Sequence, residues 1–230
     1  MAVQKATVAN LYTYIGDRIN DPSGTEVDTG AASTMLEWIN RVVGEAAQLT
    51  DCLQSSGTVT GDGTAEDFVV SGLTNMWRVI SVTDKTNGIV YHPLDRSAYQ
   101  GIRNSIVIDG VTGQYYYSLF GYDAANQKIS LLPVVENSVN ITIEHSEIPE
   151  TLLTTDTPPG LLAYYSELIV AGVAKIYFDA SGDAERAEQE FQQYIMWINR
   201  LNKEVGINPE IKPEMSSLYR MAALLNQGGK

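Results

Sequence analysis

The sequence predicts an α+β protein: an α-helical bundle with an inserted antiparallel β-sandwich or barrel domain and an extended C-terminal arm. Apolar residues recur every three or four positions in residues 33–53 and 161–205, as they do in amphipathic helices. Residues 57–146 instead alternate apolar and polar positions and contain many turn residues, which is typical of antiparallel strands. After Gly206, prolines precede one last short amphipathic segment.

These patterns predict three parts. Residues 1–53 and 150–205 form the helical bundle domain, because the first helices need the later ones to cover their apolar faces. Residues 54–149 form the inserted β domain, and residues 206–230 form the C-terminal extension.

Two helices are predicted before residue 54. The first spans residues 6–19 and ends at the turn sequence that begins at Asn20. The second begins at an N-cap, either Ser33 or Thr34, and we expect Gly44 to permit close approach of another helix. Its apolar stripe consists of Leu36, Ile39, Val43, Ala46, Thr50 and Leu53.

The middle of the chain predicts about seven short strands, which favours a sandwich or barrel. Residues 57–70 are expected to form two strands around a Gly-Asp-Gly hairpin, and residues 94–102 one short helical turn. Further strands are predicted at 77–83, 88–91, 105–109, 114–120, 127–132 and 139–145.

Helical periodicity returns after residue 160 and predicts two more helices. The break between them lies at Ser181-Gly-Asp183, and Gly206 is a suitable helix end. Their apolar faces consist of Leu162, Tyr165, Ile169, Val173 and Ile176, and of Ala187, Phe191, Tyr194, Ile198, Leu201 and Val205.

Composition narrows the possible functions. With 230 residues, 44% hydrophobic and 19% charged, the chain has the composition of a globular protein. It has neither an apolar run that could span a membrane nor a signal peptide at its start, so we expect synthesis in the cytoplasm and no membrane partner. A formal charge of −13 disfavours specific nucleic-acid binding but suits a surface past which DNA moves without sticking.

No residue pattern indicates a catalytic site, a metal site or a cofactor. Asp62, Glu66 and Asp67 lack the ligand spacing of a calcium loop, so a hairpin turn is the better interpretation. His92 and His145 fall on separate predicted strands, where no local spacing completes a zinc site.

Three other candidates favour ordinary structural roles. Glu147 and Glu150 could act as an acid/base pair, but they flank a proline on a predicted exit loop and are better explained as a solvated pair. The tyrosine run 115–117 could be a stacking platform, although packing between sheets needs fewer assumptions. Cys52, the single cysteine, is expected to be a buried, inert thiol on the second helix.

The C-terminal segment offers one apolar stripe that has no evident partner. It could fold back onto the helical bundle, or it could dock in a groove of another molecule with Pro209 and Pro213 stiffening the connection. We predict the second, with these anchors: Met215, Leu218, Tyr219, Met221, Ala222 and Leu225.

Several motifs together make the chain resemble the head–tail connector (adaptor) proteins of short-tailed phages, over roughly residues 30–205. They are Trp38-Ile-Asn-Arg-Val-Val, Thr60-Gly-Asp-Gly-Thr-Ala-Glu-Asp-Phe, Tyr115-Tyr-Tyr-Ser-Leu-Phe-Gly, Ile129-Ser-Leu-Leu-Pro133, Ile141-Thr-Ile-Glu-His and Ser181-Gly-Asp-Ala-Glu-Arg-Ala-Glu. The resemblance rests on the order of these elements more than on any one motif.

The resemblance implies a structural, non-enzymatic protein of the virion neck. Such proteins assemble as dodecameric rings under the portal protein, extend the DNA channel and offer a platform for tail or nozzle proteins. A C-terminal extension that docks on the portal is also implied.

The resemblance leads to one expectation about acidic residues, and one alternative function is kept beside it. Acidic residues of the bundle helices should line the channel, with Asp179, Asp183, Glu185 and Glu188 as candidates. The alternative function is a β-rich phage tail or receptor-binding module, which would explain the strands and tyrosines but leaves the helical ends unused.

Overall fold

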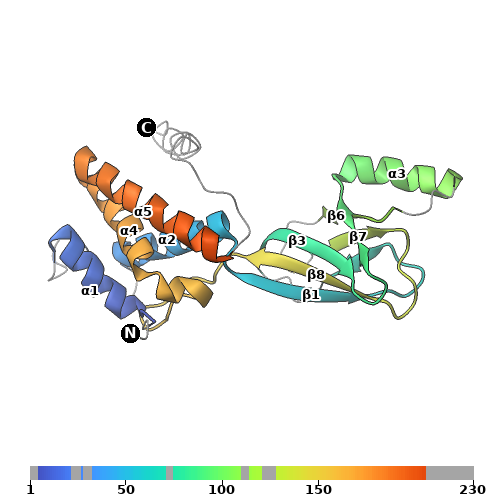
Figure 1. The fold of residues 1–230 in the computed structure, drawn as a ribbon, viewed down its shortest axis with the longest axis horizontal. Helices are drawn as coiled ribbons and strands as arrows, with labels where there is room; N and C mark the ends of the chain where they lie inside the picture. Colours follow the sequence, from blue (N-terminus) through green and yellow to red (C-terminus); the bar gives the residue numbers. More distant parts are fainter. Residues whose placement is uncertain are drawn as a thin grey trace. The chain divides into compact units, whose positions relative to one another are not determined.

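The computed structural model describes residues 5–21, 27, 33–70, 75–109, 114–120 and 128–205. Within these residues the chain has five α-helices and two four-stranded sheets, which confirms the α+β class (Figure 1). Neither sheet closes into a barrel over the described strands, so that part of the expectation is wrong. The chain forms two compact units: Gln54–Ile148, and the described residues up to Leu53 together with those from Pro149 onward.

The first unit is helical, and one helix lies at its centre. It contains α1 (Val8–Ile19), α2 (Thr34–Thr50), α4 (Ser166–Ser181) and α5 (Ala184–Val205), with a 3-10 helix, η1 (Gly160–Tyr164), before α4. Helix α4 contacts the other three, and every residue from Leu168 to Ala174 is buried (Figure 1). A helix that is apolar on all sides is stable only when it is enclosed, which explains this position.

Local sequence explains where the helices begin and end. Thr7 caps α1 in a reciprocal capping box with Asn10, and Ser33 caps α2 by accepting the Leu36 N–H, which settles the predicted choice between Ser33 and Thr34. Gly182, in the left-handed conformation, ends α4.

The expected close approach at Gly44 is wrong over the described residues, because none of their atoms outside its own helix backbone and chain neighbours lies within 4 Å of the position that a Cβ would take there. The tight contact occurs instead at Gly172, on the buried central helix, where α4 meets α2 and α5. The sequence pattern identified a glycine in a helix but could not tell an outward from an inward position.

Side-chain and backbone hydrogen bonds attach the returning chain to the helices. The Asn40 side chain on α2 donates to the Leu152 carbonyl oxygen at 3.1 Å and accepts the Leu152 N–H at 2.7 Å. At the N-terminus, the Ala6 and Val8 N–H groups donate to the carbonyl oxygens of Ala163 and Asp156. The segment before α4 is therefore fixed by polar contacts that hydrophobic periodicity does not reveal.

The second unit contains two sheets that pack face to face. Sheet A has the order β1 (Gln54–Thr60), β8 (Asn140–Glu147), β3 (Met76–Asp84), β4 (Ile89–Val90), and all its neighbouring strands are antiparallel. Sheet B has the order β2 (Asp67–Val69), β7 (Lys128–Leu132), β6 (Tyr116–Phe120), β5 (His92–Pro93), with β5 parallel to β6.

The core of this unit follows the alternation of the strands. The predicted inward positions Ile141 and Ile143 are fully buried, whereas Val139 is half-buried. Their neighbours in the core come from both sheets: Val59, Val82, Tyr91, Tyr117, Ile129 and Leu131. Side chains that alternate along each strand thus form one apolar layer between the sheets.

The predicted Gly-Asp-Gly hairpin is wrong, although both of its strands exist. β1 pairs with β8 in sheet A, and β2 pairs with β7 in sheet B, so the turn between them crosses from one sheet to the other. At this turn Gly61 lies against the backbone of Val135 and Glu136, where a Cβ would clash. The local turn sequence determined the bend but not the pairing partners.

The predicted strand 105–109 is also wrong, and the helical turn predicted at 94–102 is helical but too short. One helix, α3 (Arg96–Asp109), occupies this region and begins where the Asp95 side chain accepts the Ala98 N–H. The apolar run at 106–108 suggested a strand, and such short runs do not distinguish helix from strand.

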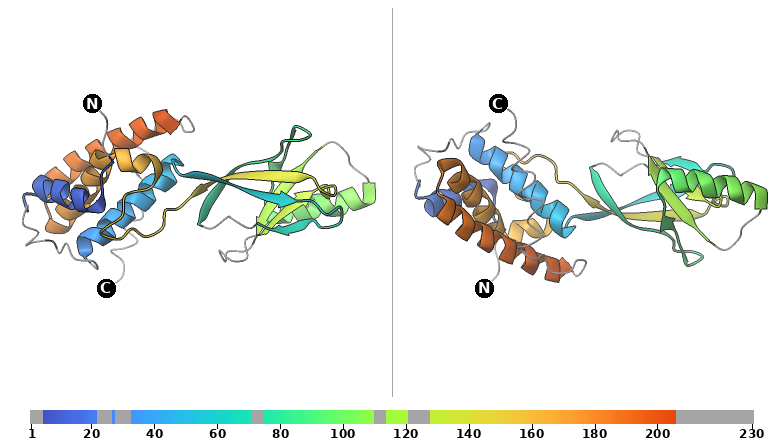
Figure 2. Two further views of the ribbon diagram at one scale, coloured as in Figure 1. Left: turned by 90° about the horizontal axis from the view of Figure 1, so that it is seen from below. Right: turned by 90° about the horizontal axis from the view of Figure 1, so that it is seen from above.

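Helix α3 covers the side of sheet B that faces away from sheet A (Figures 1 and 2). Ser130 and Leu132 of β7 are buried on that side, while Ile129 and Leu131 face the core. The unit therefore has three layers, with no described helix over the outer side of sheet A. None of the described helices is long and apolar enough to cross a membrane.

Candidate functional site

The C-terminal anchors lie outside the described residues. They are Met215, Leu218, Tyr219, Met221, Ala222 and Leu225, all beyond Val205, where α5 ends. Docking of this segment on a partner therefore stays a prediction from the sequence.

The four acidic candidates lie around the turn between α4 and α5 in the helical unit. Asp179 is on the last turn of α4, Asp183 precedes α5, and Glu185 and Glu188 are on the first turns of α5. Asp183 is half-buried and the other three are exposed. The structure therefore brings together all four residues that were selected from the sequence.

Each of three candidates has a partner in the chain. Asp179 forms an ion pair with Lys175 at 2.5 Å, and Asp183 forms one with Arg186 at 3.5 Å while its other oxygen accepts the Arg186 N–H. Glu188 accepts a hydrogen bond from Gln192 at 2.7 Å. Asp183 thus also has a structural role, because it caps the N-terminus of α5.

The two histidines lie in different sheets, as expected from separate strands. His92 is exposed on β5, whereas His145 on β8 is fully buried with its Nε2 3.2 Å from Oε1 of Glu147. No group of three His, Cys, Asp or Glu side chains in the described ranges could hold a metal ion. Glu147 is the last residue of β8 and contacts His145, so it does not form the solvated loop pair with exposed Glu150 that the sequence suggested.

The acidic residues near the Gly-Asp-Gly turn form hydrogen bonds and an ion pair within the β unit. Asp62 accepts the N–H groups of Thr64 and Ala65, which lowers the pKa of its carboxyl. Glu66 pairs with Arg103 of α3 at 2.5 Å, and Asp67 accepts a hydrogen bond from Ser130. These contacts fit a turn, although the strands on its two sides belong to different sheets and do not form the predicted hairpin.

The aromatic run and the cysteine have structural surroundings. Tyr117 is in the core, and Tyr115 packs edge-on against Tyr91 with ring centroids 5.4 Å apart. Burial, with a smaller effect of nearby Asp84, raises the pKa of Tyr91 to about 12. Cys52 lies just after α2 and not on it as predicted; it is half-buried, and burial raises the pKa of its thiol.

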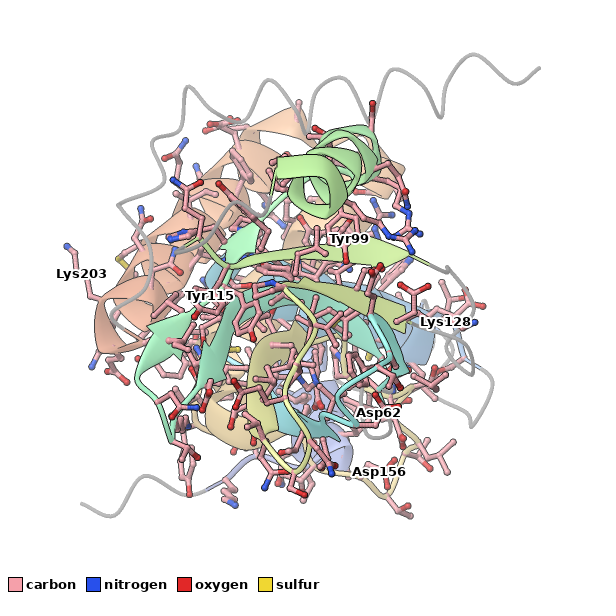
Figure 3. The ribbon with its side chains drawn as sticks, turned by 90° about the vertical axis from the view of Figure 1, so that its right-hand side faces the viewer. Asp62, Tyr99, Tyr115, Lys128, Asp156 and Lys203 are labelled. Carbon is pink, nitrogen blue, oxygen red and sulfur yellow. The ribbon has the colours of Figure 1, made fainter. Side chains whose placement is uncertain are left out.

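Sequence reasoning missed a polar network beneath α3. The Arg96 guanidinium donates to the Ser130 hydroxyl at 2.7 Å, and that hydroxyl donates to the Asp67 carboxylate at 2.5 Å. Tyr99 is buried between α3 and the sheet (Figure 3). Its ring centroid lies 5.5 Å from Cζ of Arg96. Burial and, to a smaller extent, the Glu66 carboxylate raise the pKa of Tyr99. The residues are far apart in sequence, so no local signal could have linked them.

The described residues form hydrogen-bond and ion-pair networks and a cluster of acidic side chains around the α4–α5 turn. No curated protein matches the sequence. The family model of the SU10 adaptor protein matches residues 6–208 and so covers both compact units. The chain therefore belongs to the SU10 adaptor protein family.

Proposed function

We propose that this chain is the head-to-tail adaptor of a phage particle. It forms a ring under the portal protein, extends the DNA channel and provides the attachment platform for tail or nozzle proteins. The observation that carries this proposal is the family match, which includes nearly all of the described chain. Membership makes the chain a structural phage adaptor, a virion component that associates with portal and tail components.

The two units have different tasks in this proposal. The helical domain, residues 1–53 and 150–205, forms the frame of a dodecameric ring, and the inserted β domain, residues 54–149, offers surfaces for contacts with other chains. The tightly enclosed α4 supports the frame role, because a helix buried on all sides gives a rigid scaffold. Exposed apolar side chains on the β unit, such as Trp77 and Val90, support a role in contacts with other chains.

The C-terminal extension docks on the portal. Its apolar stripe lies on a segment that begins directly after α5, and Pro209 and Pro213 favour an extended connection to it. The segment becomes a helix in a groove of the portal, with Met215, Leu218, Tyr219, Met221, Ala222 and Leu225 as its anchors.

The docking is tested by a chain that ends at Val205, mixed with portal rings and viewed by electron microscopy. Full-length protein should give twelvefold rings under the portal, and the truncated chain should bind at least about tenfold more weakly. A matched pair of variants sharpens the test: Leu218→Ser with Leu225→Ser should weaken binding, whereas Ser216→Ala with Ser217→Ala should not. Undiminished binding by the truncated chain would show that the segment is not the portal contact.

The acidic residues around the α4–α5 turn line the channel. The formal charge of the chain is −13, and four of its carboxylates are those of Asp179, Asp183, Glu185 and Glu188. Their negative charge would repel the DNA phosphates and so keep passing DNA from binding. Asp179, Glu185 and Glu188 are exposed, and charged residues this exposed contribute little to stability, which leaves them available for the channel.

The lining is tested by particles that carry Glu185→Lys and Glu188→Lys. DNA ejection should slow, and more so at low salt, because cations would hold phosphates at the wall. Glu136→Lys with Glu150→Lys makes the same charge change at exposed positions elsewhere and should leave ejection unchanged. Equal ejection rates in the two variants would contradict the lining.

A further inference from the structure

Strand β3 contains two β-bulges within five residues. Its pairing with β8 passes from Met76–Glu147 to Arg78–Ser146 and from Val79–His145 to Ser81–Glu144, so each step contains one extra residue on β3. The extra residues are Trp77 and Ile80. A bulge redirects a side chain and is a specific feature of a fold, so two bulges here have a positioning effect.

Both extra residues are large, apolar and exposed. The exposed fraction is 50% for Trp77 and 37% for Ile80, while Val82 further along the same strand is fully buried. A regular β3 would leave each of these residues in the ladder with a partner on β8. The bulges therefore hold two apolar side chains in solvent at a cost that folding alone does not explain.

The surroundings of these residues resemble the centre of an interface. We define the outer face of sheet A by Trp77, Arg78 and Ile80 together with the outward residues of its strands: Ser56, Thr58, Thr60, Ser81, Thr83, Val90, Asn140, Thr142 and Glu144. Tryptophan and arginine are the residues most enriched at binding hot spots, and carboxylates are depleted there.

The charge of this face is opposite to that of the chain. Glu144 is its only carboxylate, and that group accepts hydrogen bonds from Ser81 and from Lys85 at the adjacent turn. Arg78 and Lys85 against Glu144 give the face and its adjacent turn one positive charge in excess, whereas the chain has 28 Asp and Glu against 15 Lys and Arg. Other surfaces of the same protein are therefore electrostatically complementary to it.

We propose that the outer face of sheet A, centred on Trp77 and Ile80, is the surface that binds a second copy of this chain. The contact is head-to-tail, since two such faces would place cations against cations, whereas an acidic surface of the next copy attracts them. Head-to-tail contacts are the type that close into rings. The inference rests on the proposed ring and adds the residues that hold it together.

The experiment compares two double variants of the full-length protein. Trp77→Ser with Ile80→Ser should raise the concentration needed for self-association at least about tenfold, in sedimentation alone and in ring formation on portal particles. Val69→Ser with Leu119→Ser removes two side chains of sheet B that are 59% and 37% exposed, and it should leave association unchanged. Circular dichroism and thermal melting verify that both variants are folded.

A photoreactive residue in place of Ile80 gives a second measurement that does not depend on the double variant folding. Irradiated rings should yield a crosslink between two copies of this chain, and a photoreactive residue in place of Val69 should not. A crosslink only to a tail or portal protein, or none at all, would overturn the assignment of the partner.

The outcomes separate this inference from the proposed function. If the variant with Trp77→Ser and Ile80→Ser forms rings as well as the native protein, the inference is wrong and the proposed ring still stands. A full-length protein that stays monomeric both alone and on portal particles would overturn both. Loss of tail attachment with unchanged rings would assign the face to a tail protein and reject the second copy.

Discussion

A Cβ atom placed on Gly172 would lie 2.6 Å from Cγ1 and 3.0 Å from Cγ2 of Val42. The first distance is shorter than real Cβ contacts and the second is unusually tight, and Val42 is a stiff, buried, β-branched residue. Helices α2 and α4 thus meet at a point that only a glycine permits. The contact exchanges helix propensity for close packing at the centre of the helical unit.

Gly172→Ala should therefore destabilise the protein, in contrast to the same change at Gly44. Overpacking costs about 1–3 kcal/mol and the better helix propensity of alanine returns at most about 1 kcal/mol. Gly44→Ala meets nothing within 4 Å and should be neutral or stabilising by up to about 1 kcal/mol. Urea unfolding of both variants checks the contrast; equal stabilities would show that α2 moves aside easily.

Arg18 and Glu190 form the polar link between α1 and α5, and its loss should have a small, salt-dependent effect. The Arg18 Nε and Nη2 atoms donate to the two Glu190 carboxylate oxygens at 2.8 and 3.1 Å, and this contact raises the pKa of Arg18. Because Arg18 is 38% exposed, Arg18→Ala should lower the free energy of unfolding by only about 0.5–1 kcal/mol.

The salt dependence distinguishes the charge contact from side-chain packing. The difference from the native protein should shrink between about 0.1 M and about 1 M salt, where screening becomes strong. Lys175→Ala, which removes an ion pair within α4, is the control and should cost less. A cost for Arg18→Ala that is independent of salt would mean that packing dominates.

Asp84 should give the β unit a defined dependence on pH. Its burial disfavours the charged form, but hydrogen bonds from the Asn87 side chain and the Asn87 and Thr86 N–H groups outweigh this and lower its pKa below the ordinary 3.8. Asp84→Ala should cost about 1–3 kcal/mol at neutral pH, because those donors lose a charged acceptor.

The sign of the pH effect follows from the lowered pKa. A group whose pKa falls on folding stabilises the folded state fully above its unfolded pKa and loses this effect as pH falls through the folded pKa. The gap between native and Asp84→Ala protein should stay constant from neutral pH to about pH 5 and narrow below about pH 4. Chemical unfolding over this range measures it; a gap that closes above pH 5 would contradict the assignment.

Two buried serines that face each other across β6 and β7 should respond differently to the same substitution. Ser130 is bonded to Arg96 and Asp67, so Ser130→Ala leaves both charged groups short of a partner and should cost about 1–3 kcal/mol. The Ser118 hydroxyl is buried without a hydrogen-bond partner among the described residues, so Ser118→Ala should be neutral or stabilising.

Hydrogen exchange shows where the Ser130 variant loosens. Faster exchange should appear in α3, because the Arg96 contact attaches that helix to sheet B. Uniformly faster exchange across both sheets would instead indicate a general loss of core stability. The Ser118 variant provides the matched background for this measurement.

The sequence predicted the long helices well and the pairing of strands poorly. α5 keeps its apolar period over 22 residues, so the pattern outweighs single residues that do not fit a helix. Strand partners depend on contacts between distant residues, and the turn at Asp62 looked the same whether β2 returned to sheet A or crossed to sheet B. The apolar run at 106–108 was ambiguous because a run this short fits either a helix or a strand.

The candidate surfaces show a similar division. The acidic residues near Asp183 were found because charge is visible in the sequence, yet their ion pairs were not. The network of Arg96, Ser130 and Asp67 joins residues 34 and 63 positions apart, and no local pattern reports such contacts. The bulges at Trp77 and Ile80 were equally hidden, since a bulge exists only relative to a partner strand.

The pairing of Gln54 with Ser146 has a consequence for how such a protein can vary. The chain leaves for the β unit and comes back on adjacent strands, so the two crossing points are about 5 Å apart. The β unit therefore affects the stability of the helical unit much as a short loop would, because the entropy cost of closing a loop grows only slowly with its length. A graft of quite different size, joined through the same two strands, would leave the helical scaffold undisturbed.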